Sequence, residues 1–300
     1  MEVFQRISLT NLPEIDRILR LENSCSADYS SGNLFLWDDF YDQRVLFCGD
    51  RLITVIHGTD PVCFAFPVGR GDLKDAIEKM FEYASEMGVP FIIEGVEERH
   101  KKMLQELYPD RFSFTPDRDH ADYMYYSQSL LTYSGKSLHG KKNSCNRFEA
   151  EYSWHFEPIT EDTIPLCRSF LGEWLDDNSE RLGGGIEAEH FAINRAFDHF
   201  NELALDGGIL FADNSIFGFS IGEKNSDCCF DVHFEKARHD VKGTYSMVCR
   251  EMVKLVMKKY PEVKYINRED DTGSEALRTS KLSYCPEFLI DKYSARWIYD

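Results

Sequence analysis

Hydrophobic and polar positions recur in the same order in the two halves of the chain. Residues 45–58 and 209–222 each contain an apolar run, a short polar turn and a second apolar run that ends in glycine, a pattern that predicts a β-hairpin. A short apolar strand follows each hairpin, at residues 62–68 in the first half and at residues 228–234 in the second. The matched order predicts two structural repeats.

Helical periodicity follows each of these strands. Apolar residues recur every three or four positions after Leu73 in the first half and after Tyr245 in the second, which predicts an amphipathic helix in each. A further strand and helix are expected at residues 90–104 and again at residues 264–278. A helix is also expected before each hairpin, at residues 12–21 and 163–174. The order predicted for each half is therefore helix, hairpin, strand, loop, helix, strand, helix, strand. The fold class expected is α/β with a mixed (α+β) sheet.

This order of elements resembles the GNAT acyltransferase fold. The resemblance implies two tandem GNAT-like units, at residues 1–132 and 153–300, joined by a basic loop at residues 133–152. In that fold, backbone N–H groups of the loop before the central helix bind the anionic arm of the donor at the positive end of the helix dipole.

The central strands of the two halves differ in the polar residues that they carry. Where the first half has Ala65 and Pro67, the second has Asp231 and His233. Alternate residues of a strand share one face, and an Asp and a His there are costly unless they are paired or solvated. They form either a catalytic pair or an internally hydrogen-bonded one, and the C-terminal unit is expected to bear the active site while the N-terminal unit is degenerate.

The charge of the chain is strongly negative, at −18, which argues against a general surface for nucleic acid or anionic membranes. One stretch differs: between residues 134 and 148 there are four cations and no carboxylate, namely Lys136, Lys141, Lys142 and Arg147. This patch suits phosphate or another anion, although a solvated linker would have the same composition.

The residues given predict neither a targeting segment nor paired cysteines. No apolar segment has the length of a membrane span, so stable membrane insertion is not expected. The nine cysteines include no C-x-x-C pair, which is typical of a reduced, cytoplasmic protein.

Two long stretches carry a more specific resemblance. "LTYSGKSLHGKKNSCNRFE" and "YINREDDTGSEALRTSKLSYCPEFLIDKY" resemble the C-terminal domain of phosphatidylglycerol lysyltransferases and related uncharacterised bacterial proteins. Members of that family have two tandem GNAT-like units, as do the Fem-type peptidyltransferases, and the lysyltransferases move an aminoacyl group from a charged tRNA to a lipid headgroup. The resemblance implies that the signature residues in the second stretch contribute to the site: Asn267, Arg268, Glu269, Leu277, Arg278, Lys281 and Tyr284.

Together these patterns predict an acyl-type transferase, most like an aminoacyl-tRNA-dependent transferase to a small-molecule or lipid headgroup acceptor. The alternatives are an acyl-CoA-dependent N-acyltransferase and a non-catalytic ligand-binding protein. Gly243 alone fits the GNAT phosphate loop, and Asp240 in that loop would repel a pyrophosphate. An aminoacyl-tRNA or an acyl-CoA is expected as donor substrate, with no tightly bound cofactor and no metal site.

The candidate catalytic residues are Glu269, as general base or amine-binding carboxylate, with Asp231 and His233. Convergence of these three around an open hollow would favour an enzyme, and burial in mutual ion pairs would favour a binding protein. The candidate substrate-binding residues are Lys136, Lys141, Lys142, Arg147, Gly243, Asn267, Arg268, Arg278, Lys281 and Tyr284.

Overall fold

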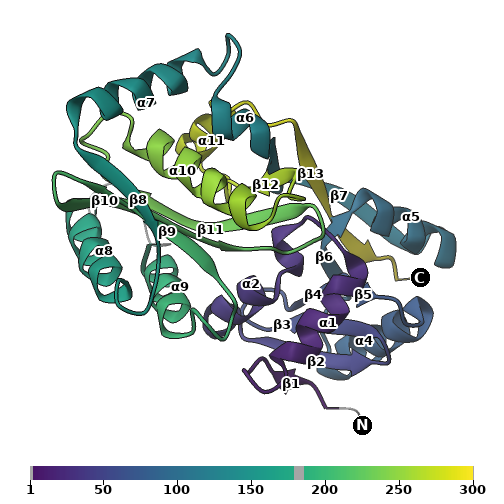
Figure 1. The fold of residues 1–300 in the computed structure, drawn as a ribbon. Helices are drawn as coiled ribbons and strands as arrows, with labels where there is room; N and C mark the ends of the chain where they lie inside the picture. Colours follow the sequence, from purple (N-terminus) through teal and green to yellow (C-terminus); the bar gives the residue numbers. More distant parts are fainter. Residues whose placement is uncertain (1–2, 179–185, 300) are drawn as a thin grey trace. The chain divides into compact units, whose positions relative to one another are not determined.

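The computed structural model describes residues 3–178 and 186–299 (Figure 1). Residue contacts divide them into two compact units. Unit 1 contains the chain up to Asp122, residues Asp270–Glu275 and the chain from Leu289 onward. Unit 2 contains Tyr123–Glu269 and Ala276–Phe288.

The sheet of unit 1 has the strand order β1-β2-β3-β4-β6-β13-β7, with β5 beside β3. Its strands are β1 (Gln5–Arg6), β2 (Gln43–Cys48), β3 (Arg51–Ile56), β4 (Cys63–Ala65), β5 (Val68–Gly69), β6 (Ile92–Glu97), β7 (Phe112–Tyr126) and β13 (Phe288–Trp297). Its helices are α1 (Leu12–Glu22), η1 (Ala27–Tyr29), α2 (Ser31–Leu36), α3 (Asp38–Tyr41), α4 (Leu73–Met87) and α5 (Glu98–Leu107).

Helix α4 illustrates how the sequence sets the elements of unit 1. Leu73, Ile77 and Met80 form its buried face, as the apolar spacing predicts. The side chain of Asp72 caps the first turn by accepting hydrogen bonds from backbone N–H groups, and Gly88 ends the helix in the left-handed conformation, with φ 68°. The first-turn amides of α4 are thus satisfied by a carboxylate of the chain itself.

Unit 2 has the strand order β12-β11-β10-β9-β8, and β12 also pairs with the last residues of β7. Its strands are β8 (Trp154–Pro158), β9 (Asp206–Ala212), β10 (Ser215–Glu223), β11 (Cys229–Ala237) and β12 (Tyr265–Asn267). Its helices are α6 (Ser127–Thr132), α7 (His139–Glu151), α8 (Ile164–Asn178), α9 (Ile186–Asp198), α10 (Thr244–Lys259) and α11 (Glu275–Leu282).

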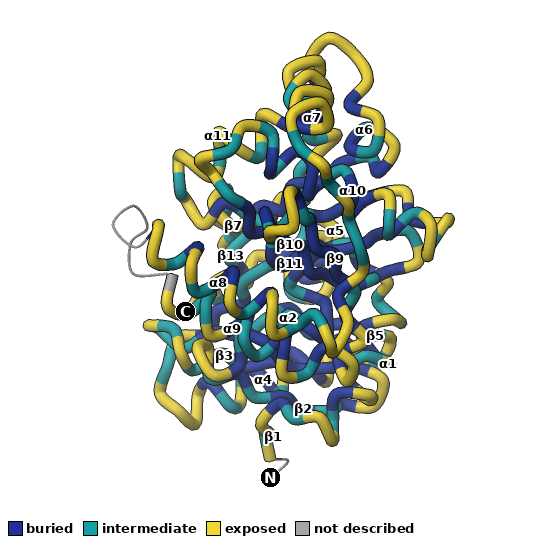
Figure 2. The backbone as a smooth tube through the Cα atoms, turned by 60° about the vertical axis from the view of Figure 1, so that its left-hand side comes forward, coloured by how far each residue is buried: buried dark blue, intermediate teal, exposed yellow. Residues whose placement is uncertain are grey.

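Strand β11 is the central strand of unit 2. It runs parallel to β12, with Asp231 opposite Asn267, and antiparallel to β10. Helix α10 packs against β9, β10 and β11. Figure 2 shows β11 and its neighbours as mostly buried, so a polar side chain on this strand lies in the interior of the unit.

The prediction of two repeats in an α/β fold is confirmed, because α1, β2–β4, α4, β6 and α5 recur in order as α8, β9–β11, α10, β12 and α11. The last strand of each repeat does not follow the division expected at residues 132 and 153. β13 pairs with β6 of unit 1, whereas the end of β7 pairs with β12 of unit 2. Pairing between residues far apart in sequence leaves no local signal, so the sequence pattern placed both strands in the unit that precedes them in the chain.

The segment expected to be a basic loop, residues 133–152, contains the helix α7. Leu138, Cys145 and Phe148 are buried with the spacing of a helix face. The glycines and lysines around them had suggested a flexible linker, but three apolar anchors at helical spacing determine the structure instead.

Within residues 3–178 and 186–299, no helix is long and apolar enough to cross a membrane. None of the nine cysteines, all of which lie in these ranges, forms a disulfide.

Candidate functional site

A row of ionisable side chains lies along one face of β11. Asp231, His233 and Glu235 occupy alternate positions of the strand and therefore point to the same side of the sheet. The side chains of Asp231 and His233 are fully buried, and that of Glu235 is 9% exposed. Three ionisable groups on a central strand require partners from neighbouring elements.

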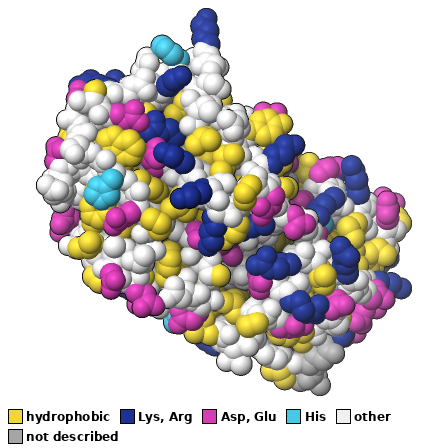
Figure 3. Space-filling view, in the orientation of Figure 1, with side chains coloured by type: hydrophobic (Ala, Val, Ile, Leu, Met, Phe, Trp, Pro, Cys, Tyr) yellow, Lys and Arg dark blue, Asp and Glu magenta, His cyan; other side chains and the backbone are white. Residues whose placement is uncertain are grey.

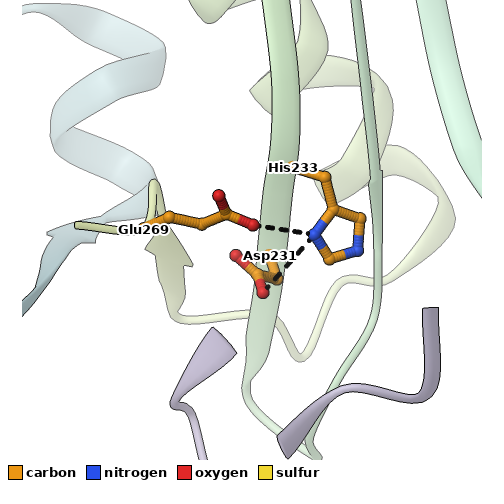
Figure 4. A group of neighbouring side chains, drawn as sticks. All are labelled: Asp231, His233 and Glu269. Atoms are coloured by element: carbon orange, nitrogen blue, oxygen red, sulfur yellow. Dashed lines mark hydrogen bonds and ion pairs between the residues drawn. The ribbon is translucent and has the colours of Figure 1, made fainter. Parts of the chain in front are cut away.

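His233 is held between carboxylates (Figure 4). Its Nδ1 lies 2.9 Å from Oε1 of Glu269 and 3.7 Å from Oδ2 of Asp231. Its Nε2 lies 3.0 Å from Oε1 of Glu223, at the end of β10. We call Glu223, Asp231, His233 and Glu269 the acidic cluster.

Burial by itself would lower the pKa of His233, but the neighbouring carboxylates of Asp231, Glu223 and Glu269 raise it well above its usual value. The imidazole is therefore protonated near neutral pH. Three carboxylates, those of Glu223, Asp231 and Glu269, thus contact this one ring.

Glu269 is the member of the cluster that reaches solvent, since its side chain is 23% exposed while those of the other three members are at most 7% exposed. Its backbone is left-handed, with φ 56°, a conformation that costs a non-glycine residue about 1 kcal/mol or more. The side chain of Asn267 stabilises this turn, because its Oδ1 accepts a hydrogen bond of 2.7 Å from the N–H of Glu269. Strained backbone of this kind is frequent in functional sites.

A second group surrounds Glu235, two positions after His233 on β11. Nη2 of Arg268 is 2.8 Å from Oε1 of Glu235, and its guanidinium lies over the ring of Tyr284 at 4.4 Å. Nζ of Lys141 lies 3.5 Å from the centre of the same ring, and Nζ of Lys281 donates to the carbonyl oxygen of Arg268. We call Arg268, Lys141, Lys281, Tyr284 and Glu235 the cationic cluster.

The structure thus brings together most of the predicted site residues, but not all. Lys136, Lys142 and Arg147 are exposed, and Arg147 pairs with Glu151 at 2.6 Å. Arg278 is half-buried on α11. Figure 3 shows positive and negative side chains interspersed over the face drawn, with no continuous basic surface on it.

Gly243, predicted to bind an anion, lies at the N-terminus of α10 with φ 99°. A Cβ atom at this position would lie 2.6 Å from the backbone oxygen of Ser144 in α7. Helix α7 therefore covers the loop where the GNAT fold binds its donor phosphates.

Two members of these clusters were not predicted from the sequence. Glu235 continues the alternation of Asp231 and His233, so the two-residue period of the strand could have predicted that it lies on the same face. Glu223 lies at the end of an apolar strand, and only the pairing of β10 with β11 shows its proximity to His233.

The ligand atoms of Asp231, His233 and Glu269 lie within 4.8 Å of one another, a spacing that a metal ion could occupy. Imidazole binds a metal only through a deprotonated ring nitrogen, whereas carboxylates next to both nitrogens of His233 favour the imidazolium. The donor set as arranged fits a proton better than a metal.

The sequence profile of the family described as "Phosphatidylglycerol lysyltransferase, C-terminal" matches residues 20–296. The chain belongs to this family. Its name is that of a transferase, so the predicted enzyme class, an acyl- or aminoacyl-type transferase, is confirmed at this level.

Solved structures agree with the fold. A conserved protein of unknown function from Bacteroides thetaiotaomicron is 34% identical, with a TM-score of 0.94, and the alignment covers 99% of this chain and 100% of that one. L-PGS from Bacillus licheniformis is 17% identical, with a TM-score of 0.68 and coverage of 99% and 94%. A tandem GNAT protein from the clavulanic acid biosynthesis pathway is 10% identical, with a TM-score of 0.52 and coverage of 99% of both chains. The tandem GNAT-like fold is therefore confirmed.

Proposed function

We propose that this chain transfers an aminoacyl group from a charged tRNA to a small-molecule or lipid headgroup acceptor, in the cytoplasm, where charged tRNA is found. The family supports a transferase. The observation that carries the proposal is the partly exposed carboxylate of Glu269, fixed by His233 in an otherwise buried network. A carboxylate in this position is suited to accept a proton from a substrate.

In the proposed reaction, Glu269 takes the proton from the hydroxyl or amine of the acceptor while its oxygen or nitrogen attacks the carbonyl carbon of the aminoacyl ester. The ester bond to the terminal ribose of the tRNA breaks, and the proton passes to the ribose oxygen that leaves. His233 and Asp231 lie behind Glu269 and act as positioning residues. The ester is already activated, so positioning and proton transfer are the main requirements.

The close approach of α7 to α10 argues against the acyl-CoA alternative. The backbone of Ser144 lies against Gly243, at the helix end where a pyrophosphate would bind in the GNAT fold. Asp240 and Arg238 of the same loop pair with each other at 3.2 Å. The backbone of α7 thus lies where a CoA pyrophosphate would bind, and the positive charge of Arg238 in this loop is already paired with Asp240.

One observation favours a non-catalytic ligand-binding protein instead. Asp231 and His233 are fully buried, and their nearest charged neighbours belong to the same cluster. A network that is saturated by its own members would hold the fold together without turning over a substrate.

Donor consumption tests the proposal. The protein is incubated with a mixture of radiolabelled charged tRNAs and candidate acceptors, including phosphatidylglycerol vesicles, and separately with acetyl-CoA and amines. We expect transfer of label from tRNA, and no transfer by a folded Glu269→Gln variant. Release of CoA without use of tRNA would establish the acyl-CoA alternative. A folded protein that consumes neither donor would overturn the transferase proposal in favour of a binding protein.

A further inference from the structure

A cavity of about 300 Å³ lies in unit 2, between the end of β8, the start of β9 and the last two turns of α10. Among the residues that the structure describes, none that lines this cavity belongs to the acidic or the cationic cluster. Helix α10 is about 24 Å long, and the cavity lies at its C-terminal end, whereas Gly243 precedes its N-terminus. The cavity is therefore separate from the residues to which the proposed transfer is assigned.

The walls of the cavity are largely apolar. Ile159 and Phe200 are 6% and 7% exposed, and Leu255 of α10 is half-buried. Gly207 lets Ile159 lie close against β9, because a Cβ atom at Gly207 would be 2.6 Å from Cδ1 of Ile159. The volume corresponds to about ten water-sized groups, which is at the small end of the range for ligand pockets. It suits the tail of a small molecule.

Three charged side chains also line the cavity, those of Asp206, Lys258 and Lys259. The carboxylate of Asp206 is already paired: Oδ1 accepts a hydrogen bond of 2.6 Å from Lys259, and Oδ2 accepts one of 2.8 Å from the hydroxyl of Tyr260. Lys258 is exposed and has no ion pair or hydrogen bond within residues 3–178 and 186–299. The charged residues of the lining therefore have one positive charge in excess.

This combination of walls and charge selects a class of ligand. Lysines are common in the last turn of a helix, where they face the negative end of its dipole, but the dipole does not account for an apolar cavity beside them. An apolar tail that ends in an anion complements both features. One positive charge in excess suits a singly charged carboxylate better than a doubly charged phosphate ester. A lysine ammonium acts as a point charge and needs no paired oxygens in a fixed geometry.

We propose that this cavity binds a medium-chain fatty acid, with its hydrocarbon tail against Ile159, Phe200 and Leu255 and its carboxylate beside Lys258. A volume of ten water-sized groups corresponds to a carboxylate with a chain of about eight carbons in total. The inference goes beyond the proposed function, because it uses neither the acidic nor the cationic cluster. Binding is measured without tRNA or acceptor, so its failure and the failure of the transferase are distinguishable.

Titration calorimetry on the full chain tests the ligand class, with butyrate, hexanoate and octanoate below their micelle concentrations. We expect saturable binding whose affinity rises by up to about fourfold per added methylene, because each methylene buries apolar surface. Octanol, which has the same tail without the charge, should bind about threefold more weakly than octanoate. Absence of saturable octanoate binding, or equal affinity for octanol, overturns the proposal. Tighter binding of octyl phosphate than of octanoate would overturn the assignment to a carboxylate.

A pair of lysine variants tests the position of the carboxylate. Lys258→Gln should weaken octanoate binding by about three- to fivefold and leave octanol binding unchanged, because it removes an exposed charge and no apolar surface. Lys254→Gln is the matched control, since Lys254 is exposed one turn earlier on α10 and does not line the cavity. It should leave the binding of both ligands unchanged. Equal octanoate affinity in the two variants would overturn the role of Lys258.

A second pair of variants tests the position of the tail. Leu255→Trp places a larger side chain in the cavity and should weaken octanoate binding at least about tenfold. Leu166→Trp makes the same change at an exposed position of α8 outside the cavity and should alter the affinity by less than about twofold. Circular dichroism verifies that each variant is folded. Unchanged octanoate binding in a folded Leu255→Trp variant would place the ligand elsewhere and overturn the site.

Discussion

The corresponding strand, loop and helix of the two units differ in how their polar groups are satisfied. In unit 1 the loop before α4 is closed from within: the buried guanidinium of Arg51 donates to the carbonyl oxygens of Pro67 and Gly71, and Asp72 caps the helix. In unit 2 the equivalent strand carries Asp231 and His233, which are fully buried, and His233 contacts Glu223 and Glu269 of other elements. Two copies of one hydrophobic pattern can therefore support two different arrangements: a loop closed by its own hydrogen bonds, and a buried cluster of ionisable side chains.

The largest difference between the units should appear in activity. We expect Glu269→Gln to reduce aminoacyl transfer at least about a hundredfold, because it removes the proposed proton acceptor without changing the size of the side chain. In unit 1, Glu94 of β6 lies opposite Ala65, as Asn267 lies opposite Asp231 in unit 2. Glu94→Gln should leave transfer unchanged. Initial rates of transfer at saturating donor are measured for both variants, and circular dichroism verifies that each is folded. Equal losses of activity in the two variants would show that unit 2 does not carry the active site alone.

A substitution in the loop of unit 1 should lower the stability of the protein and leave its activity unchanged. Arg51→Gln removes hydrogen bonds to Pro67 and Gly71 in a buried site, and we expect the free energy of unfolding to fall by about 2–4 kcal/mol. Transfer per folded molecule should not change. Urea unfolding gives the stability, and Arg70→Gln, at an exposed position in the same loop, is the control. A loss of activity without a loss of stability would place Arg51 in the site instead.

Acid should weaken unit 1 through Glu22. Burial raises the pKa of this carboxyl, but hydrogen bonds from His100 and the N–H of Gly69, with the charge of Arg99, lower it to about 2 from 4.5. The folded state therefore gains stability above pH 4.5, and this gain of up to about 3 kcal/mol is lost as the pH falls towards 2. Urea unfolding at a series of pH values should show a shallower acid slope for Glu22→Gln than for the wild type, and an unchanged slope would contradict this assignment.

Alkali should weaken unit 2 through His233. The carboxylates of Glu223 on β10, Asp231 on β11 and Glu269 after β12 raise its folded-state pKa well above 6.5. The stabilisation from the charged ring is complete below pH 6.5 and is lost as the pH rises through the higher folded-state pKa. Thermal unfolding between neutral and alkaline pH should show this decline for the wild type, whereas His233→Gln should remove it.

Many of the features compared here could be predicted from local patterns in the sequence. The hairpins, the amphipathic helices and the alternation of Asp231 and His233 all follow from periods of two or three to four residues, and Glu269 followed from the family resemblance. Lys141 and Lys142 could not be separated from sequence, because the helix that buries one and exposes the other was read as a loop. Glu223 became a neighbour of His233 only through strand pairing, which sequence spacing does not encode.

The placement of β13 has a consequence for synthesis on the ribosome. Residues from Leu289 onward belong to the unit that begins at the N-terminus, where they pair with β6. The first unit to emerge therefore lacks this strand until residues 288–297 have been synthesised, and one edge of β6 is unpaired in the meantime. Termination before residue 288 would leave the nascent protein with an open sheet, a state that chaperones and proteases recognise.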